Sequence, residues 1–305
     1  MNRLRIGSRG SALALAQASW VKRRIEEHLP EMQVELRTIR TSGDRFLNAP
    51  IKEIGGKGIF TKEIEEALTG GEIDLAVHSL KDLPTQLPAG LTLVAVPKRE
   101  DARDVLISRS HANLAELAQN ATIGTGSLRR RSQLLAHRPD LKIMPVRGNI
   151  DTRLKKLDRG DFDALVLAAA GLRRVGCEHY ITEFLPDQIC VSAVAQGALG
   201  LEGRDQADLR ECLAFLHDAP TFAEVAAERA FADRLGSGCH VPIGARARVL
   251  GMELTITAVV ASLEGQKICR GEIVGHMSEA VGLGQSLADR LIGEGADKLL
   301  AAVRL

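Results

Sequence analysis

Short apolar segments alternate with longer segments of helical character along most of this chain, and this alternation limits the folds that it can adopt. Residues 4–9, 34–39 and 75–80 are typical of strands, and a helix is expected from Ser11, its N-cap, to about His28. A parallel strand pair needs a long crossover, which is usually a helix. The sequence therefore predicts an α/β chain with mostly parallel sheets.

The same alternation continues in a second unit that begins near Arg103. Helices are expected to start near Ser127 and near Asn149. The expected strands of this unit are residues 105–108, 122–127, 142–146 and 164–168.

A third unit has a different order of elements. Thr221 and Glu224 have the spacing of a capping box, which predicts a helix that runs to Leu235 and is ended by Gly236. Strands are expected at residues 243–249, 253–260 and 267–274, followed by a helical segment at 278–303. Strands followed by helix indicate a small α+β domain.

The composition excludes several classes of protein. The 305 residues, 45% hydrophobic and 26% charged, are enough for two or three domains of a soluble globular protein. A net charge of +1 and 3% aromatic residues argue against binding to nucleic acid or to membranes. Because the N-terminus has no apolar signal segment and the five cysteines suit a reducing compartment, we expect a cytoplasmic protein.

Arginines gather where the predicted strands end or the following helices begin. Arginine binds carboxylate or phosphate through two parallel hydrogen bonds, and this edge of an open α/β sheet is where ligands bind. Either these arginines line a cleft for a ligand with many anionic groups, or some of them are solvated helix faces. No phosphate-binding P-loop is present, so ATP is not indicated. The arginines concerned are Arg9, Arg129, Arg130, Arg131, Arg147, Arg153, Arg173 and Arg174.

Two further residues are candidates for chemistry. Asp82 follows the strand at 75–80 and precedes a proline turn, a place suited to a catalytic carboxylate, although with Lys81 it could equally form a surface ion pair. Cys239 stands alone in the loop "RLGSGCHVPIG", with no second cysteine near enough for a metal or redox pair. A lone thiol is more often a packing residue, and this one follows a helix C-terminus, which disfavours a thiolate.

Seven motifs together resemble the porphobilinogen deaminase family, also called hydroxymethylbilane synthases, over essentially the whole chain. They are "LRIGSRGSALALAQA", "GGKGIFTKEIE", "DLAVHSLKDLPT", "GTGSLRRRSQL", "RGNIDTRL", "AAERAF" and "GCHVPIG". The resemblance implies a transferase that joins four porphobilinogen molecules head to tail into 1-hydroxymethylbilane, with release of four ammonia, in tetrapyrrole (haem) biosynthesis. The chain would grow on a dipyrromethane cofactor held by a thioether to Cys239.

The resemblance also implies two domains like type II periplasmic binding proteins plus a small α+β C-terminal domain. Domain 1 would comprise residues 1–98 and 198–216, domain 2 residues 99–197, and domain 3 residues 217–305 with the cysteine loop. We expect a monomer whose partner is the small molecule porphobilinogen, with no metal.

Site residues are carried over by matched position. Asp82 would be the catalytic carboxylate and would also contact the cofactor, and the sequence departs from the family at Ala195, where glycine is common. The other expected cofactor-binding residues are Lys81, Ser127, Arg129, Arg130 and, covalently, Cys239. The expected substrate-binding residues are Arg9, Ser11, Gln17, Lys57, Phe60, Arg147, Arg153, Arg174 and Gln196.

A second class of function remains open at this point. A non-catalytic cytosolic sensor of the same periplasmic-binding-like fold could use the arginines to hold an anion, and it would need neither the Cys239 adduct nor Asp82. RNA binding is a weaker reading that the charge and aromatic content oppose.

Overall fold

The computed structural model describes residues 3–42, 61–236 and 241–304. By their internal contacts these residues divide into two compact units. Met1–Arg99 and Ala198–Phe222 form unit 1, and Glu100–Gly197 and Ala223–Leu305 form unit 2. Each unit is described by itself.

Unit 1 is built on a five-stranded sheet in the order β2-β1-β3-β10-β4. The strands β1, β2 and β3 run parallel, whereas β10 runs antiparallel to β3 and β4, so the sheet is mixed. Its strands are β1 (Arg3–Ser8), β2 (Gln33–Thr38), β3 (Leu75–Ser79), β4 (Leu91–Ala95) and β10 (Leu199–Arg204).

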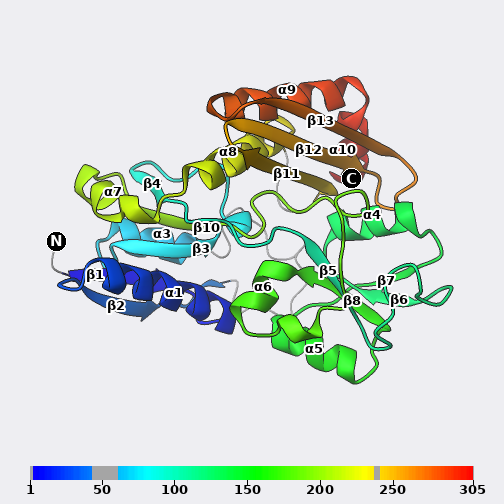
Figure 1. The fold of residues 1–305 in the computed structure, drawn as a ribbon, viewed down its shortest axis with the longest axis horizontal. Helices are drawn as coiled ribbons and strands as arrows, with labels where there is room; N and C mark the ends of the chain where they lie inside the picture. Colours follow the sequence, from blue (N-terminus) through cyan, green and yellow to red (C-terminus); the bar gives the residue numbers. More distant parts are fainter. Residues whose placement is uncertain (1–2, 43–60, 237–240, 305) are drawn as a thin grey trace. The chain divides into compact units, whose positions relative to one another are not determined.

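Helix α1 (Ala12–His28) packs on this sheet and closes the core of unit 1 (Figure 1). Ser11 caps it as predicted, since its side chain accepts a hydrogen bond from the backbone N–H of Ala14. In the described part of unit 1 the structure also has the helical elements α3 (Lys62–Thr69), η2 (Leu80–Asp82), α7 (Ala207–Leu213) and η4 (Ala214–Leu216).

Unit 2 contains a second five-stranded sheet with the order β7-β6-β8-β5-β9, which repeats the pattern of unit 1. Again three neighbouring strands are parallel and the other two join antiparallel. Its strands are β5 (Asp104–Ser108), β6 (Thr122–Gly124), β7 (Lys142–Met144), β8 (Ala164–Ala168) and β9 (Glu183–Phe184). Two sheets of one topology confirm the predicted α/β class, but the expectation of mostly parallel pairing is wrong for the antiparallel strands.

Three short helices follow the parallel strands of this sheet. The helix α4 (Leu128–His137) begins after the predicted N-cap Ser127, and α5 (Ile150–Asp158) begins after Asn149. The strand predicted over 122–127 ends at Gly124, because Ser127 takes the capping position instead. The third is α6 (Ala169–Arg174), and the single turn η3 (Glu178–Tyr180) comes after it.

The C-terminal part of unit 2 is a three-stranded antiparallel sheet with helices on one face (Figure 1). Alternation along β11 (Ile243–Leu250) buries Ala245 and Ala247 and turns Arg246 and Arg248 to the other face. The other elements are β12 (Glu253–Ala261), β13 (Ile268–His276), η5 (Met277–Glu279), α9 (Ala280–Gly293) and α10 (Ala296–Arg304). The helix expected over 278–303 is divided at Gly295, which has a φ of +99°.

Helix α8 (Ala219–Arg234) corrects the predicted capping box. The helix starts two residues before Thr221, and the Asp218 carboxylate accepts the hydrogen bond from the Thr221 N–H at 2.9 Å. Glu224 instead accepts from the N–H of Val249. The predicted stop is confirmed, since Gly236 has a φ of +58°.

Candidate functional site

Of the residues predicted for unit 1, those that the structure describes lie at or near the carboxyl edge of its sheet. Arg9 and Ser11 follow β1, and Lys81 and Asp82 follow β3, its parallel neighbour, in the single turn η2. Gln17 lies on α1 and is buried. Its side-chain amide donates to the Ser79 hydroxyl at 2.8 Å, which joins the helix to the end of β3.

Asp82 is an exposed carboxylate at this edge. Leu80 anchors the turn, because it is fully buried and its N–H donates to the carbonyl of Ala198 at 3.0 Å. The Leu83 N–H closes the turn on the carbonyl of Leu80. The fold thus holds the backbone of Asp82 firmly while its side chain faces solvent, where it can reach a ligand.

A buried pair lies on β3 and β10 of the same sheet. His78 Nε2 and Glu202 Oε2 are 2.9 Å apart, and the Glu202 side chain is fully buried. Neither residue was singled out from the sequence, and Glu202 becomes a neighbour of His78 only through the antiparallel pairing of β10 with β3.

In unit 2 the predicted residues lie at the corresponding edge. The parallel strands β7, β6 and β8 end there, followed by Arg147, by Ser127 and by α6 with Arg174 at its end. Arg147 is exposed and Arg153 is half-buried, with its Nε donating to the carbonyl of Gly148 at 2.8 Å. The backbones of three strands therefore bring these side chains to one edge.

Arg129 and Arg130 differ from the others because they are only 4% and 6% exposed. Both are ion-paired with Asp104, a fully buried carboxylate that the sequence analysis did not single out. The idea of solvated helix faces is therefore wrong for these two arginines. A solvated helix face is a better description for Arg131, because this residue pairs with the exposed Glu264.

Arg174 and Gln196 lie beside the turn at Gly197. The Arg174 Nη2 donates to the Gly197 carbonyl at 2.6 Å, and burial lowers the pKa of this guanidinium to about 10. It therefore remains charged at neutral pH. Gln196 is 1% exposed and donates to Ala102 O and to Asp104 Oδ1. Gly197 has a φ of +89°, and a Cβ there would lie 2.4 Å from the Glu100 carbonyl oxygen, so this position requires glycine.

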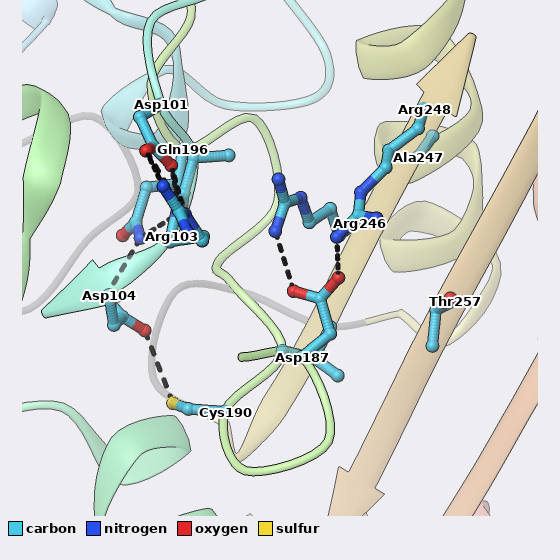
Figure 2. Close-up of polar contacts among 12 residues, drawn as sticks. Asp101, Arg103, Asp104, Asp187, Cys190, Gln196, Arg246, Ala247, Arg248 and Thr257 are labelled. Atoms are coloured by element: carbon cyan, nitrogen blue, oxygen red, sulfur yellow. Dashed lines mark hydrogen bonds and ion pairs between the residues drawn. The ribbon is translucent and has the colours of Figure 1, made fainter. Parts of the chain in front are cut away.

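A groove of about 1000 Å³ lies on the arginine-bearing face of the three-stranded sheet. Figure 2 shows Asp187 placed between Arg246 and Arg248, and its carboxylate accepts a hydrogen bond from each guanidinium. Arg270 donates to the main-chain carbonyl of Asp187 at 2.7 Å. These arginines are thus used to hold the Asp187 segment to the sheet.

Three predicted site residues cannot be placed. Cys239, Lys57 and Phe60 lie outside the described residues.

The other four cysteines are free thiols: Cys177, Cys190, Cys212 and Cys269. No helix in the described part of the chain is both long enough and apolar enough to cross a membrane.

Comparison with known proteins gives matches over nearly the whole chain. Residues 4–211 match the family described as porphobilinogen deaminase, dipyromethane cofactor binding domain, and residues 222–293 match the porphobilinogen deaminase C-terminal domain. The porphobilinogen deaminase of Trichlorobacter lovleyi is 51% identical, over 99% of this chain and 96% of that protein. The porphobilinogen deaminase of Geobacter sulfurreducens is 48% identical, over 99% of this chain and 95% of that protein.

The solved structures that match include a bacterial binding protein and a bacterial lipoprotein. The aliphatic sulphonate binding protein SsuA from Escherichia coli is 14% identical with a TM-score of 0.41, over 97% of this chain and 88% of that one. A YaeC-family lipoprotein from Enterococcus faecalis is 10% identical with a TM-score of 0.44, over 71% of this chain and 91% of that one. By the sequence matches, this chain belongs to the porphobilinogen deaminase family.

Proposed function

We propose that the chain is a hydroxymethylbilane synthase, a transferase that joins four porphobilinogen molecules head to tail and releases four ammonia. The observation that carries the proposal is the family match over residues 4–211 and 222–293, which includes each residue assigned a role below. A passive anion sensor of the same fold is not favoured, because the matching relatives bear the name of an enzyme.

The donor set of unit 2 fits the carboxylates of a dipyrromethane group. Ser127 supplies a hydroxyl at a helix N-terminus. Among the described residues, Nε and Nη2 of Arg129 donate to no acceptor, so these N–H groups are available to a ligand. Two guanidinium groups share one internal carboxylate, which leaves a positive charge for an anionic ligand. These residues, with Lys81, would hold the cofactor, which supplies the point of attachment for the growing pyrrole chain and would be bound covalently by Cys239.

The remaining basic residues would bind substrate. Each porphobilinogen carries an acetate and a propionate group, so every addition brings new carboxylates that need counter-charge and hydrogen-bond donors. Exposed and half-buried arginines at the sheet edges can supply both. The residues proposed for this role are Arg9, Ser11, Gln17, Lys57, Phe60, Arg147, Arg153, Arg174 and Gln196.

Asp82 would act on the reacting pyrrole. Loss of ammonia and the coupling step both create positive charge that spreads to the pyrrole nitrogen. A carboxylate near that N–H stabilises the cation and can accept or return a proton. We further propose that the enzyme works as a monomer in the cytoplasm.

The test is the substitution Asp82→Asn, which keeps the shape of the side chain and removes its charge. We expect kcat for porphobilinogen consumption to fall by at least roughly a hundredfold, since general acid–base catalysis contributes that much. Intact mass should show that the cofactor is retained. Asp208→Asn, at an exposed aspartate of α7, is the matched control and should leave kcat within experimental error. A rate for Asp82→Asn near that of the control would remove Asp82 from the mechanism.

A further inference from the structure

Asp104 lies at the same edge of the unit 2 sheet as the proposed ligand-binding residues, although it comes from a strand of opposite direction. It is the first residue of β5 and pairs with Ala168, the last residue of β8. Its backbone is fixed on the other side as well, since its carbonyl accepts from the Leu185 N–H at 2.9 Å. Asp104 is fully buried.

The Asp104 carboxylate contacts three of the proposed ligand-binding residues at once. Oδ1 accepts from Arg130 Nε at 3.0 Å and Nη2 at 2.7 Å, and from Gln196 Nε2 at 2.9 Å. Oδ2 accepts from Arg129 Nη1 at 2.6 Å. Figure 2 shows Asp104 with Gln196 on one side and Cys190 on the other. One buried carboxylate therefore binds two guanidinium groups and an amide and holds them close together.

Each of these three side chains also donates to a main-chain carbonyl, and Arg129 contacts the Cys190 sulfur as well. Arg129 donates to Val191 O at 2.7 Å and Arg130 to Val166 O at 3.0 Å. Gln196 donates to Ala102 O at 2.7 Å. The bonds to Asp104 come from a different direction than those to the carbonyls, so together they fix the direction of each side chain.

The charges explain why this acceptor is a carboxylate. Burial would raise the pKa of Asp104, but the two guanidinium groups outweigh it and hold the pKa well below its ordinary value. The neighbouring Cys190 thiol stays neutral, because burial and Asp104 raise its pKa to about 12. A buried cation is costly unless it is paired, so a neutral residue at 104 would leave two uncompensated arginines.

We propose that Asp104 is a positioning residue that sets Arg129, Arg130 and Gln196 as one rigid unit for binding the carboxylates of the pyrrole chain. This inference rests on the proposed function. It assigns to Asp104 no contact with substrate, only the orientation of the groups that make that contact.

The test compares two variants with a matched control. Asp104→Asn removes the charge. Asp104→Glu keeps the charge but displaces it, and it should disturb folding less because the buried arginines stay paired. The control is Asp101→Asn, three residues away, whose carboxylate accepts three side-chain hydrogen bonds from Arg103 (Figure 2) and pairs with Arg173. Neither arginine is one of the proposed ligand-binding residues. Cofactor loading is followed by intact mass after apo-protein is mixed with porphobilinogen, at a temperature at which circular dichroism shows each variant to be folded.

We expect both Asp104 variants to load cofactor at least about tenfold more slowly than wild type, because small displacements of binding groups are costly. Once loaded, they should show a raised KM for porphobilinogen with a smaller change in kcat. Asp101→Asn should load cofactor within twofold of the wild-type rate, even if its melting temperature falls as far as those of the Asp104 variants.

The inference is overturned if either Asp104 variant loads at the wild-type rate, if Asp101→Asn is equally slow, or if neither Asp104 variant folds. The last result would assign the carboxylate to stability alone. Failure of the proposed function is a separate result, since wild type itself would then neither gain mass nor consume porphobilinogen.

Discussion

At the scale of single residues, Ala195 has a backbone conformation that alanine rarely adopts. Its φ is +58°, its N–H donates to the Glu228 carboxylate at 2.6 Å, and it is fully buried. An L-residue in this region costs roughly 1–2 kcal/mol. Glycine at this position would avoid that cost.

We therefore predict that Ala195→Gly leaves stability unchanged or raises it by up to about 1 kcal/mol. Relief of the backbone strain, roughly 1–2 kcal/mol, exceeds the roughly 0.8 kcal/mol lost with one buried methyl group. Ala193→Gly, two residues earlier and at negative φ, should instead lower stability by about 0.5–1 kcal/mol. Urea unfolding of both variants decides the matter, and an equal loss in the two would show that Ala195 is not strained.

At the scale of elements, α8 and α9 approach so closely that only glycine fits between them. A Cβ on Gly284 would lie 2.1 Å from the Ala227 carbonyl oxygen, whereas a Cβ on Gly282 of the same helix would meet nothing within 4 Å. Alanine normally stabilises a helix interior by up to about 1 kcal/mol relative to glycine. At Gly284 the tertiary contact reverses this effect, so that alanine destabilises the protein.

We predict that Gly284→Ala lowers the free energy of unfolding by about 1–3 kcal/mol, the usual cost of overpacking. Gly282→Ala should be neutral or stabilising. Thermal unfolding of the two proteins measures the difference, and a Gly284→Ala protein as stable as Gly282→Ala would contradict the close packing of α8 against α9.

Local signals located many of the elements in advance. Ser11, Ser127 and Asn149 cap the predicted helices, because capping depends on the residue itself and its next turn. The capping-box prediction at Thr221 was wrong because the carboxylate of Asp218, the residue before α8, takes the capping role. An aspartate at that position was an equally local signal.

Tertiary contacts were beyond the reach of those signals. The clustering of arginines at strand ends was visible, but nothing in the sequence distinguishes the buried Arg129 from the surface residue Arg131. That difference is made by Asp104, which lies 25 residues away in sequence and reaches Arg129 only through the pairing of β5 with β8. Paired buried charges of this kind are found only once the fold is known.

At the scale of the whole molecule, several carboxylates make stability depend on pH. Asp74 accepts hydrogen bonds from Arg5 on β1 and from Arg204 on β10. Burial alone would raise its pKa, but these guanidinium groups lower it below the ordinary value. Because the folded pKa is below the unfolded one, Asp74 stabilises the protein above about pH 4 and loses this effect as the pH falls through the folded pKa.

We predict that Asp74→Asn lowers stability by about 2 kcal/mol at pH 7, the scale of charged hydrogen bonds. The gap from wild type should shrink steadily below about pH 4, where Asp74 itself becomes neutral. Melting temperatures between pH 7 and pH 2.5 test this, with the exposed Asp151→Asn as a control that should show little gap at any pH. A gap for Asp74→Asn that does not narrow in acid would contradict the assignment.

The most direct test of the whole account is the intact mass of the purified protein under reducing conditions. We predict that wild type, and the control Cys269→Ser, are heavier than their sequences by one dipyrromethane group, whereas Cys239→Ser has the mass of its polypeptide alone. A wild-type protein of bare mass that gains nothing on incubation with porphobilinogen would contradict the account, and an adduct that persists in Cys239→Ser would move the attachment to another residue.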